Sequence, residues 1–289
     1  MATSDPNLLV SADWLAERLS APDIRIVDAS LYLPGDPRDG RTEYLKAHIP
    51  GARFFDIDDI AERHSPLPHM MPPVEKFVSR VRKMGIGDGH RVIVYDQQGL
   101  FSAARVWWMF RVFGHQDVAV LDGGLPQWLA GGHPVEDQEP EPRERHFTGR
   151  RNASMMRDVT QIAGTAKLRD EQIVDARSPG RFRGDEPEPR AGLRAGHIPG
   201  ARNVHYASLL NPDGTMKGID ATRAVFEAAG VDLARPIVTS CGSGITAAIL
   251  NLALHRMGHG RNSLYDGSWV EWGAYPDLAV ETRVRRGPL

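Results

Sequence analysis

The stretch His-Ile-Pro-Gly-Ala-Arg at residues 48–53 recurs without change at residues 197–202. Two further motifs repeat at nearly the same spacing: Ile-Val-Asp-Ala at 26–29 and 173–176, and Asp-Gly followed by a tryptophan at 122–128 and 266–272. The copies lie about 150 residues apart, whereas the repeats of solenoid proteins span roughly 20–50 residues. The sequence therefore predicts two copies of a whole domain.

Each copy alternates short apolar segments with helical patterns. An apolar segment at 92–95 precedes a helical stretch at 103–113, and one at 236–239 precedes a helical stretch at 247–257. This alternation favours an α/β fold in which a mostly parallel sheet carries helices on both faces. Because residues 136–151 are rich in proline and charge, we predict a first domain at 1–140, a linker at 141–158 and a second domain at 159–289.

Composition excludes several classes of function. The 289 residues include 35 Lys and Arg against 37 Asp and Glu, a net charge of −2 that gives no reason to expect nucleic acid as a partner. No run of about 18 apolar residues indicates a membrane span. The first residues lack the basic and apolar regions of a secretory signal. We therefore expect a cytoplasmic protein that does not act at a membrane.

Cys241 is the only cysteine, and it lies between a predicted strand and a predicted helix. Unpaired N–H groups at the start of a helix favour the thiolate, which is the reactive form of cysteine. The alternative is a small buried side chain, the usual place of a free cysteine. One cysteine makes neither an internal disulfide nor a Cys-x-x-Cys metal site, and we expect no metal and no cofactor. Superposing the copies places Gln97 opposite Cys241, so we expect one reactive site and one supporting copy that lines it from the other side.

Two tandem copies with Cys-Gly-Ser-Gly-Ile-Thr-Ala at 241–247 in the second resemble a two-domain rhodanese-type sulfurtransferase. The resemblance covers nearly the whole chain, and further matching segments lie at 105–111, 121–124, 186–190 and 266–272. It implies two rhodanese-like domains, of which the second is catalytic. It also implies that a cysteine persulfide forms and passes its sulfur to a nucleophile such as a thiol, cyanide or a thioredoxin-like protein.

The resemblance also bears on the sulfur donor. Loops similar to Cys-Gly-Ser-Gly-Val-Thr belong to the family members that use 3-mercaptopyruvate and release pyruvate, whereas Cys-Arg-Lys-Gly-Val-Thr is associated with thiosulfate. Gly242 and Ser243 therefore favour 3-mercaptopyruvate. Transfer from thiosulfate to cyanide is the alternative.

Carried over residue by residue, the resemblance makes Cys241 the nucleophile and Ser243, with His69 and Asp58, its aid in proton transfer. Without the resemblance, His69 is one of 11 histidines and Asp58 a cap or turn residue. The resemblance also assigns Arg181 and Arg190 to the carboxylate and ketone of the donor, although arginines in such a loop are commonly solvated. Guanidinium groups suit this role because they bind carboxylates bidentately.

The rest of the loop is expected to contact the donor through Gly242, Gly244, Ile245 and Thr246, and the hydroxyl of Thr246 is expected to cap the next helix. We expect structural roles for residues that occur in both copies, namely His48 with His197 and Asp28 with Asp175. Arg183 and Arg194 are expected on the surface, and tryptophans 107, 108, 128, 269 and 272 in packing.

Two other classes of function fit the sequence less well. A cysteine phosphatase or arsenate reductase needs an arginine six residues after the cysteine, where this chain has Ala247. A sulfur carrier without turnover is disfavoured by the intact loop. The first copy also has Phe101 where the family often has a tyrosine, so no phenol is available there.

Overall fold

The computed structural model describes residues 8–282. Among these, residues 8–153 together with 210–217 form an N-terminal unit, and residues 154–209 with 218–282 form a C-terminal unit. Within residues 8–282, no helix combines the length and the apolar character that crossing a bilayer requires.

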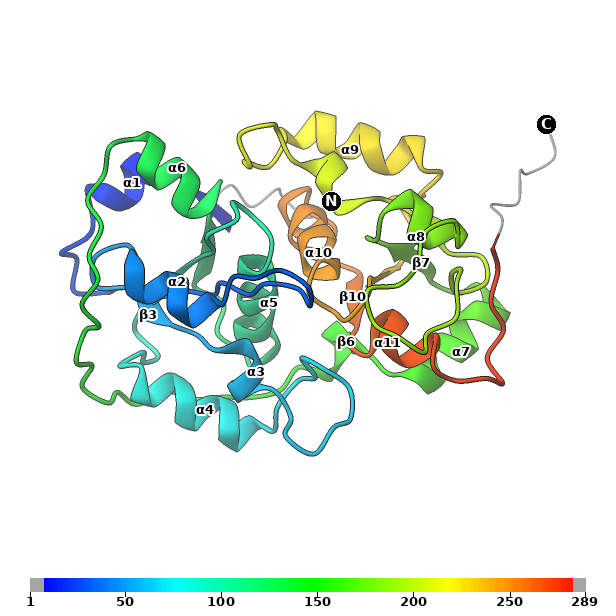
Figure 1. Ribbon diagram of the computed structural model, residues 1–289, viewed down its shortest axis with the longest axis horizontal. Coiled ribbons are helices and arrows are strands. Elements are labelled where there is room, and N and C mark those ends of the chain that lie inside the picture. Colours follow the sequence, from blue (N-terminus) through cyan, green and yellow to red (C-terminus); the bar gives the residue numbers. More distant parts are fainter. Residues whose placement is uncertain (1–7, 283–289) are drawn as a thin grey trace. The chain divides into compact units, whose positions relative to one another are not determined.

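Each unit contains one sheet of five parallel strands (Figure 1). The N-terminal sheet has the order β1-β5-β4-β2-β3, and the C-terminal sheet has the order β6-β10-β9-β7-β8. The N-terminal strands are β1 (Leu9–Val10), β2 (Ile24–Asp28), β3 (Arg53–Phe54), β4 (Arg91–Tyr95) and β5 (Val118–Leu121). The C-terminal strands are β6 (Met156–Arg157), β7 (Gln172–Asp175), β8 (Arg202–Asn203), β9 (Ile237–Ser240) and β10 (Asn262–Tyr265). The two orders correspond strand for strand, which confirms the duplication and the parallel α/β fold.

Helices connect the strands, as parallel pairing requires. Those of the N-terminal unit are α1 (Ala12–Ala16), α2 (Gly40–Lys46), α3 (Ile57–Ile60), α4 (Val74–Lys83), α5 (Ala103–Val112) and α6 (Gly124–Ala130). Those of the C-terminal unit are α7 (Val159–Leu168), α8 (Pro179–Arg183), α9 (Ile219–Ala228), α10 (Ala247–Arg256) and α11 (Ser268–Trp272). The 3-10 helices are η2 (Ala153–Met155) and η3 (Tyr206–Leu209).

The central helix of each unit is buried on nearly all sides. In α5 every residue but Arg111 is buried, and in α10 every residue from 247 to 254 is buried. Helices that are apolar all round lie in the interior of a domain. By contrast, α7 starts at the surface with a capping box, in which Asp158 accepts from the N–H of Gln161 and the Gln161 side chain accepts from that of Asp158. The five tryptophans expected in packing are all at most 2% exposed.

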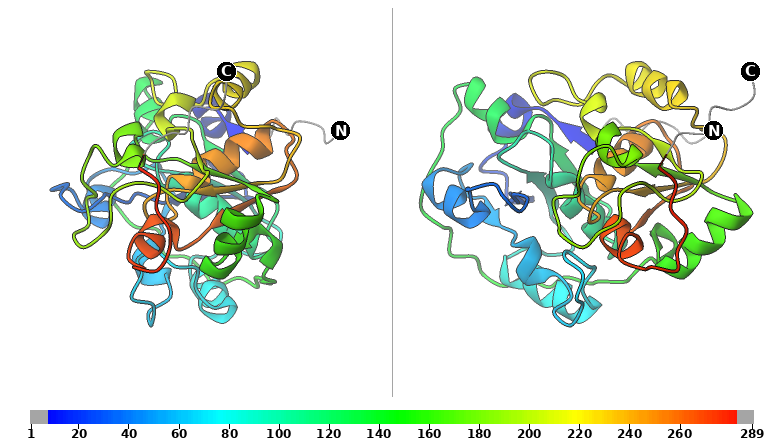
Figure 2. Two further views of the ribbon diagram at one scale, coloured as in Figure 1. Left: turned by 90° about the vertical axis from the view of Figure 1, so that its right-hand side faces the viewer. Right: turned by 45° about the vertical axis from the view of Figure 1, so that its right-hand side comes forward.

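Residues after α6 run in extended form along the outside of the N-terminal unit, past α4 (Figures 1 and 2). Phe147 lies in this segment, is buried, and contacts the rings of Phe77 and Phe110. Residues 141–153 therefore pack on the N-terminal unit. Residues 210–217 lie within the second copy of the sequence, yet they group with the N-terminal unit, where the N–H of Met216 donates to Asp122 at 2.7 Å.

The repeated His-Ile-Pro-Gly motif is built the same way in both units. His48 donates through Nδ1 to the carbonyl of Tyr44, and its ring stacks on that tyrosine. His197 likewise donates to the carbonyl of Phe182 and stacks on its ring. Both histidines are at most 2% exposed. Their surroundings fit the structural role that the sequence predicted.

The repeated aspartates differ in their surroundings. Asp175 pairs with the buried guanidinium of Arg177, whereas the corresponding neighbour of Asp28 is Ser30, which donates its N–H at 2.9 Å. Burial raises the pKa of Asp28 to about 6, against the lowering effect of the hydrogen bonds from Ser30. The N-terminal unit therefore keeps a buried carboxyl group without a cation beside it.

Asp28→Asn is expected to remove a pH dependence of folding. The unfolded chain releases the Asp28 proton near pH 3.8 and the folded chain near pH 6, so stability falls as pH rises between these values and is then constant. The asparagine variant should lack this fall and be more stable at neutral pH by about 2–3 kcal/mol. Urea unfolding at a series of pH values measures both effects.

Asp175→Asn is the matched control, because it removes the partner of a buried guanidinium and should destabilise the chain. An unfolding curve for Asp28→Asn with the same pH slope as the parent would contradict the assignment.

Candidate active site

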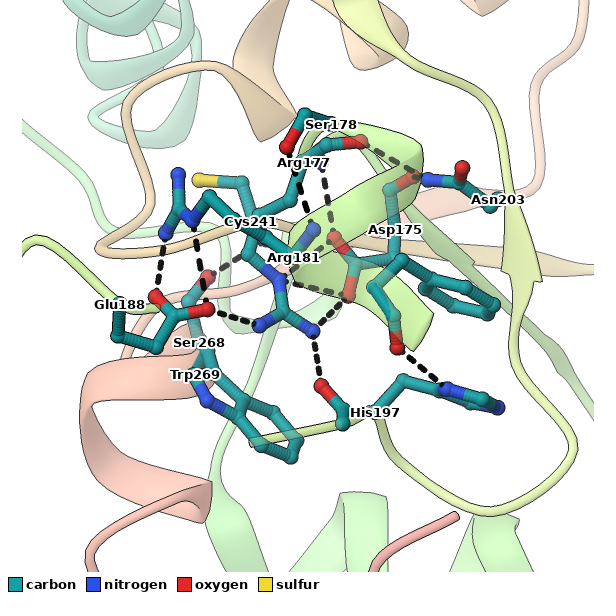
Figure 3. Close-up of polar contacts among 12 residues, drawn as sticks. Asp175, Arg177, Ser178, Arg181, Glu188, His197, Asn203, Cys241, Ser268 and Trp269 are labelled. Carbon is teal, nitrogen blue, oxygen red and sulfur yellow. Dashed lines mark hydrogen bonds and ion pairs between the residues drawn. The ribbon is translucent and has the colours of Figure 1, made fainter. Parts of the chain in front are cut away.

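Cys241 follows β9 directly and begins the turn that leads into α10. Its side chain is 1% exposed, and its Sγ accepts the N–H of Gly244 at 3.1 Å. The N–H of Cys241 donates to Oγ of Ser268, which donates in turn to the carbonyl of Tyr265 (Figure 3 shows the serine beside the cysteine). The N–H of Trp269 donates to the Cys241 carbonyl at 3.0 Å. The thiol is therefore fixed from the strand, the turn and the start of α11.

The sheet register corrects the expected pairing of Cys241 with Gln97. Asp28 lies opposite Tyr95 in the N-terminal sheet, and Asp175 lies opposite Ser240 in the C-terminal sheet. The residue that follows the central strand is therefore Asp96 in one copy and Cys241 in the other. The sequence comparison was wrong by one residue because the turns carry too few shared residues to fix it.

The hydrogen bonds of Asp96 show which groups surround the residue that follows the central strand. Its Oδ2 accepts three N–H groups at the start of α5, from residues 101, 102 and 103, at 2.7–2.9 Å, and its Oδ1 accepts that of Gln98. A carboxylate thus occupies the amino end of the central helix in the N-terminal unit. The same turn in the C-terminal unit carries a thiol, which places Cys241 where the fold stabilises negative charge.

The other loop residues form the walls of this turn. Ser243 and Ile245 are buried, at 4% and 2% exposure. Gly244 has φ of +80°, a conformation that L side chains rarely adopt. Thr246 is the residue before α10, but its side chain makes no capping hydrogen bond. The expected cap is wrong because Thr246 has helical dihedral angles, whereas a capping side chain needs an extended backbone.

Arg181 lies beside the cysteine loop. It sits in the last turn of α8, and its Nη2 atom lies 2.9 Å from the place that a Cβ on Gly242 would take. Glu188 holds the guanidinium through two contacts, at 2.5 and 3.3 Å (Figure 3). The structure therefore brings Arg181 together with Cys241 and Gly242, and Gly242 leaves the room that the guanidinium occupies.

A buried ionic network that the sequence did not reveal holds Glu188. The Arg177 side chain is fully buried, and it bridges Asp175 and Glu188, each at 2.7 Å (Figure 3). It also donates to the carbonyl of Gly196 and lies 4.3 Å from the ring of Trp269. Burial lowers the pKa of Arg177, but the two carboxylates outweigh it and raise the pKa above its usual value. The position of Arg181 thus depends, through Glu188, on the buried charge of Arg177. The one available signal was that Arg177 stands in the second copy where Ser30 stands in the first.

The other arginines of this region differ from one another. Arg190 is half-buried in the loop after α8. Arg183 is exposed and pairs with Asp185 at 2.6 Å, as expected for a surface residue. Arg194 is not a free surface residue: it donates to carbonyls at the end of α11 and beyond, including those of Trp272 and Leu278. Its guanidinium is held because carbonyls at and beyond the end of a helix need donors from outside that helix.

His69 and Asp58 lie in the N-terminal unit and contact each other. Nδ1 of His69 donates to Oδ1 of Asp58 at 2.7 Å, and the histidine side chain is 6% exposed against 62% for the aspartate. His69 has φ of +61°, and the fully buried Arg105 donates to its carbonyl at 2.5 Å. A carboxylate on Nδ1 leaves Nε2 as the basic atom. The expected hydrogen-bonded pair of His69 and Asp58 is therefore present. Arg105, which the sequence did not single out, binds the backbone carbonyl of His69.

The known proteins that this chain resembles share one type of domain and one type of activity. The model of the rhodanese-like domain matches twice, at residues 11–131 and 159–275. Human 3-mercaptopyruvate sulfurtransferase is 44% identical over 91% of this chain and 91% of its own length. Bovine thiosulfate sulfurtransferase is 43% identical over 96% of this chain and 95% of its own. The crystal structure of SseA from Escherichia coli, described as a 3-mercaptopyruvate sulfotransferase, superposes with a TM-score of 0.84 at 42% identity, covering 91% of this chain and 99% of SseA.

Arg177→Met is expected to destabilise the chain by about 3–5 kcal/mol, because it leaves the carboxylates of Asp175 and Glu188 buried without their shared cation. The free energy of unfolding in urea measures this effect. Arg183→Ala is the matched control and should change stability by less than about 1 kcal/mol, since its ion pair is exposed. Equal stabilities of the two variants would show that the network does not hold the loop.

Proposed function

Because the chain belongs to the rhodanese-like domain family, we propose that it is a sulfurtransferase that takes sulfur from 3-mercaptopyruvate and releases pyruvate. The observation that carries this proposal is the place of Cys241. Its Sγ accepts the N–H of Gly244 in the turn where the other copy holds the Asp96 carboxylate. A turn that stabilises a carboxylate also stabilises a thiolate and the persulfide formed from it.

The proposed reaction has two steps. The Cys241 thiolate attacks the sulfur of 3-mercaptopyruvate, the carbon–sulfur bond breaks, and the electron pair stays on carbon as the enolate of pyruvate, which then takes up a proton. The persulfide on Cys241 is next attacked at its outer sulfur by an acceptor, and the Cys241 thiolate is regenerated. Ser243 assists proton transfer, together with His69, whose Nδ1 proton is held by Asp58. Thiols, cyanide and a thioredoxin-like protein are the proposed acceptors.

Local charge supports the choice of donor. Arg181 is the cation beside Gly242, and Glu188 already compensates its charge while leaving guanidinium N–H groups available. A donor with one carboxylate and a ketone suits such a neutralised pair, whereas thiosulfate carries two negative charges. Arg181 and Arg190 are the proposed contacts to the carboxylate and the ketone, with the backbone of Gly242, Gly244, Ile245 and Thr246 around the reacting sulfur.

The alternative is transfer from thiosulfate to cyanide. It is favoured by the bovine relative, which is named for that donor and resembles this chain as closely as the human relative does. Both donors lead to the same persulfide on Cys241, so the rates with the two donors distinguish the proposals.

The turnover rate with 3-mercaptopyruvate is expected to exceed that with thiosulfate when both are measured with a panel of acceptors. Mass spectrometry should show one added sulfur atom on Cys241 after incubation with the donor alone, and Cys241→Ser should show neither the adduct nor turnover. Faster turnover of thiosulfate would favour the alternative. A stable adduct without any turnover would indicate a sulfur carrier.

Arg190→Ala is expected to raise KM for 3-mercaptopyruvate by roughly 10–100-fold, since a hydrogen bond to a charged group contributes about 1.5–3 kcal/mol. The rate at saturation should change little, because binding of the donor carboxylate is common to the ground state and the transition state. Arg183→Ala serves as the control with an exposed arginine of the same region. Unchanged kinetics of Arg190→Ala would remove this residue from the donor site.

A further inference from the structure

A cavity of about 370 Å³ lies at the amino edge of the C-terminal sheet. The cysteine loop lies at the opposite edge: Arg235 precedes β9 and Cys241 follows it, so roughly 20 Å of extended chain separates the two. The cavity volume falls in the usual range of small-molecule sites. Its charged lining residues are Arg169, Glu171, Arg202, Arg235 and Glu281.

Three guanidinium groups from separate segments meet at this cavity. Arg169 follows α7, Arg202 begins β8 and Arg235 precedes β9. Among the ion pairs of residues 8–282, none joins any of the three to a carboxylate. Arg169 donates to the carbonyl of Pro199 at 2.7 Å, and Arg235 donates to that of Arg169. Arg202 is exposed, and its side chain makes no hydrogen bond within residues 8–282, although its backbone belongs to β8. Most of their donors are therefore available to a ligand.

The two carboxylates of the cavity wall offset only part of this charge. Glu171 makes two hydrogen bonds to Arg157, at 2.6 and 2.8 Å. Glu281 accepts the N–H of Gly200 at 2.9 Å and lies near His197. Arg157 compensates the charge of Glu171, whereas Glu281 keeps its charge at the cavity wall, so three arginines face one uncompensated carboxylate and the cavity keeps an excess of positive charge. Like charges held close together repel, so a bound anion would stabilise the arrangement.

The first copy provides an internal comparison. Counted along the paired strands, Pro22, Arg53 and His90 occupy the places of Arg169, Arg202 and Arg235, so only one arginine is shared. The glycines of the repeated motif, Gly51 and Gly200, differ in the space beside them. A Cβ on Gly200 would lie 1.1 Å from Nη1 of Arg169, whereas a Cβ on Gly51 would meet nothing within 4 Å.

Arg169 also has φ of +57°, a conformation in which glycine is usual at the end of a helix. The arginine cluster is thus a feature of the second copy and not of the fold.

We propose that this cavity binds a tetrahedral oxyanion with two negative charges, either inorganic phosphate or the phosphate group of a small organic phosphate. Guanidinium groups match phosphate oxygens bidentately, and three of them approaching from different segments suit a tetrahedral group better than a planar carboxylate. The cavity lies at the sheet edge away from Cys241, so this proposal does not rest on the proposed sulfur transfer.

The test is calorimetric titration of the full chain with inorganic phosphate and, separately, with glycerol phosphate. The measurements are made at mildly alkaline pH, where both probes are mostly dianions. We expect saturable binding, weakened about tenfold or more in Arg202→Ala and less in Arg202→Lys, which keeps the charge. Tighter binding of glycerol phosphate would identify an organic phosphate as the ligand, and tighter binding of phosphate would identify the inorganic ion.

Arg53→Ala is the matched control, because Arg53 occupies the place of Arg202 in the first copy. It should bind both probes as the parent does. The absence of saturable binding, or an equal loss in Arg53→Ala and Arg202→Ala, would overturn the proposal. Circular dichroism of each variant shows that a loss of binding does not reflect unfolding.

Discussion

Both units depend on the same constraint, the burial of a helix start behind the central strand. The helices α5 and α10 are largely enclosed by the core, and the N–H groups at their amino ends have no partner within the helix, so they need another acceptor. In the N-terminal unit Asp96 accepts four N–H groups of the turn and the helix start. In the C-terminal unit the sulfur of Cys241 lies in the corresponding turn. The two copies thus place a carboxylate and a thiol at the same point of the fold, and the proposed sulfur transfer rests on this difference.

A second constraint is the pairing of buried charges, which fixes the position of Arg181 next to the cysteine loop. Buried charges are tolerated only when they are paired, and Arg177 is paired on both sides by Asp175 and Glu188. Glu188 then reaches Arg181, whose guanidinium fills the space above Gly242. The residue that the family resemblance assigned to the donor is therefore positioned by three residues that do not belong to the loop. The structure explains why a glycine occupies position 242, because the Cβ of any larger residue would contact the Arg181 guanidinium.

Much of the fold was predictable, since its signals are local or repeated. The strands before Asp96 and Cys241 and the helices after them lie within one or two residues of their predicted limits, because their apolar runs are continuous and bounded by turn residues. The buried histidines of the repeated motif were also predictable, because two copies with a single thiol imply a role that is not catalytic. The turn itself was misaligned by one residue, and Gln97 was named where Asp96 lies, since only the hydrogen-bonded register aligns segments that share few residues.

The sequence by itself determined the duplication, the parallel α/β class, the single thiol and its place between a strand and a helix, because these follow from identity, periodicity and counting. Only the tertiary structure decided which charges meet. The structure joins Arg177 to Glu188, which lies 11 residues further along the chain. It also joins residues far apart in sequence, namely Arg105 with the His69 carbonyl, Arg194 with the end of α11, and the three arginines of the amino-edge cavity. The physical reason is that the sequence around an arginine does not show whether its side chain is solvated or buried. Its role depends on which carboxylate or carbonyl the folded chain brings within hydrogen-bonding distance.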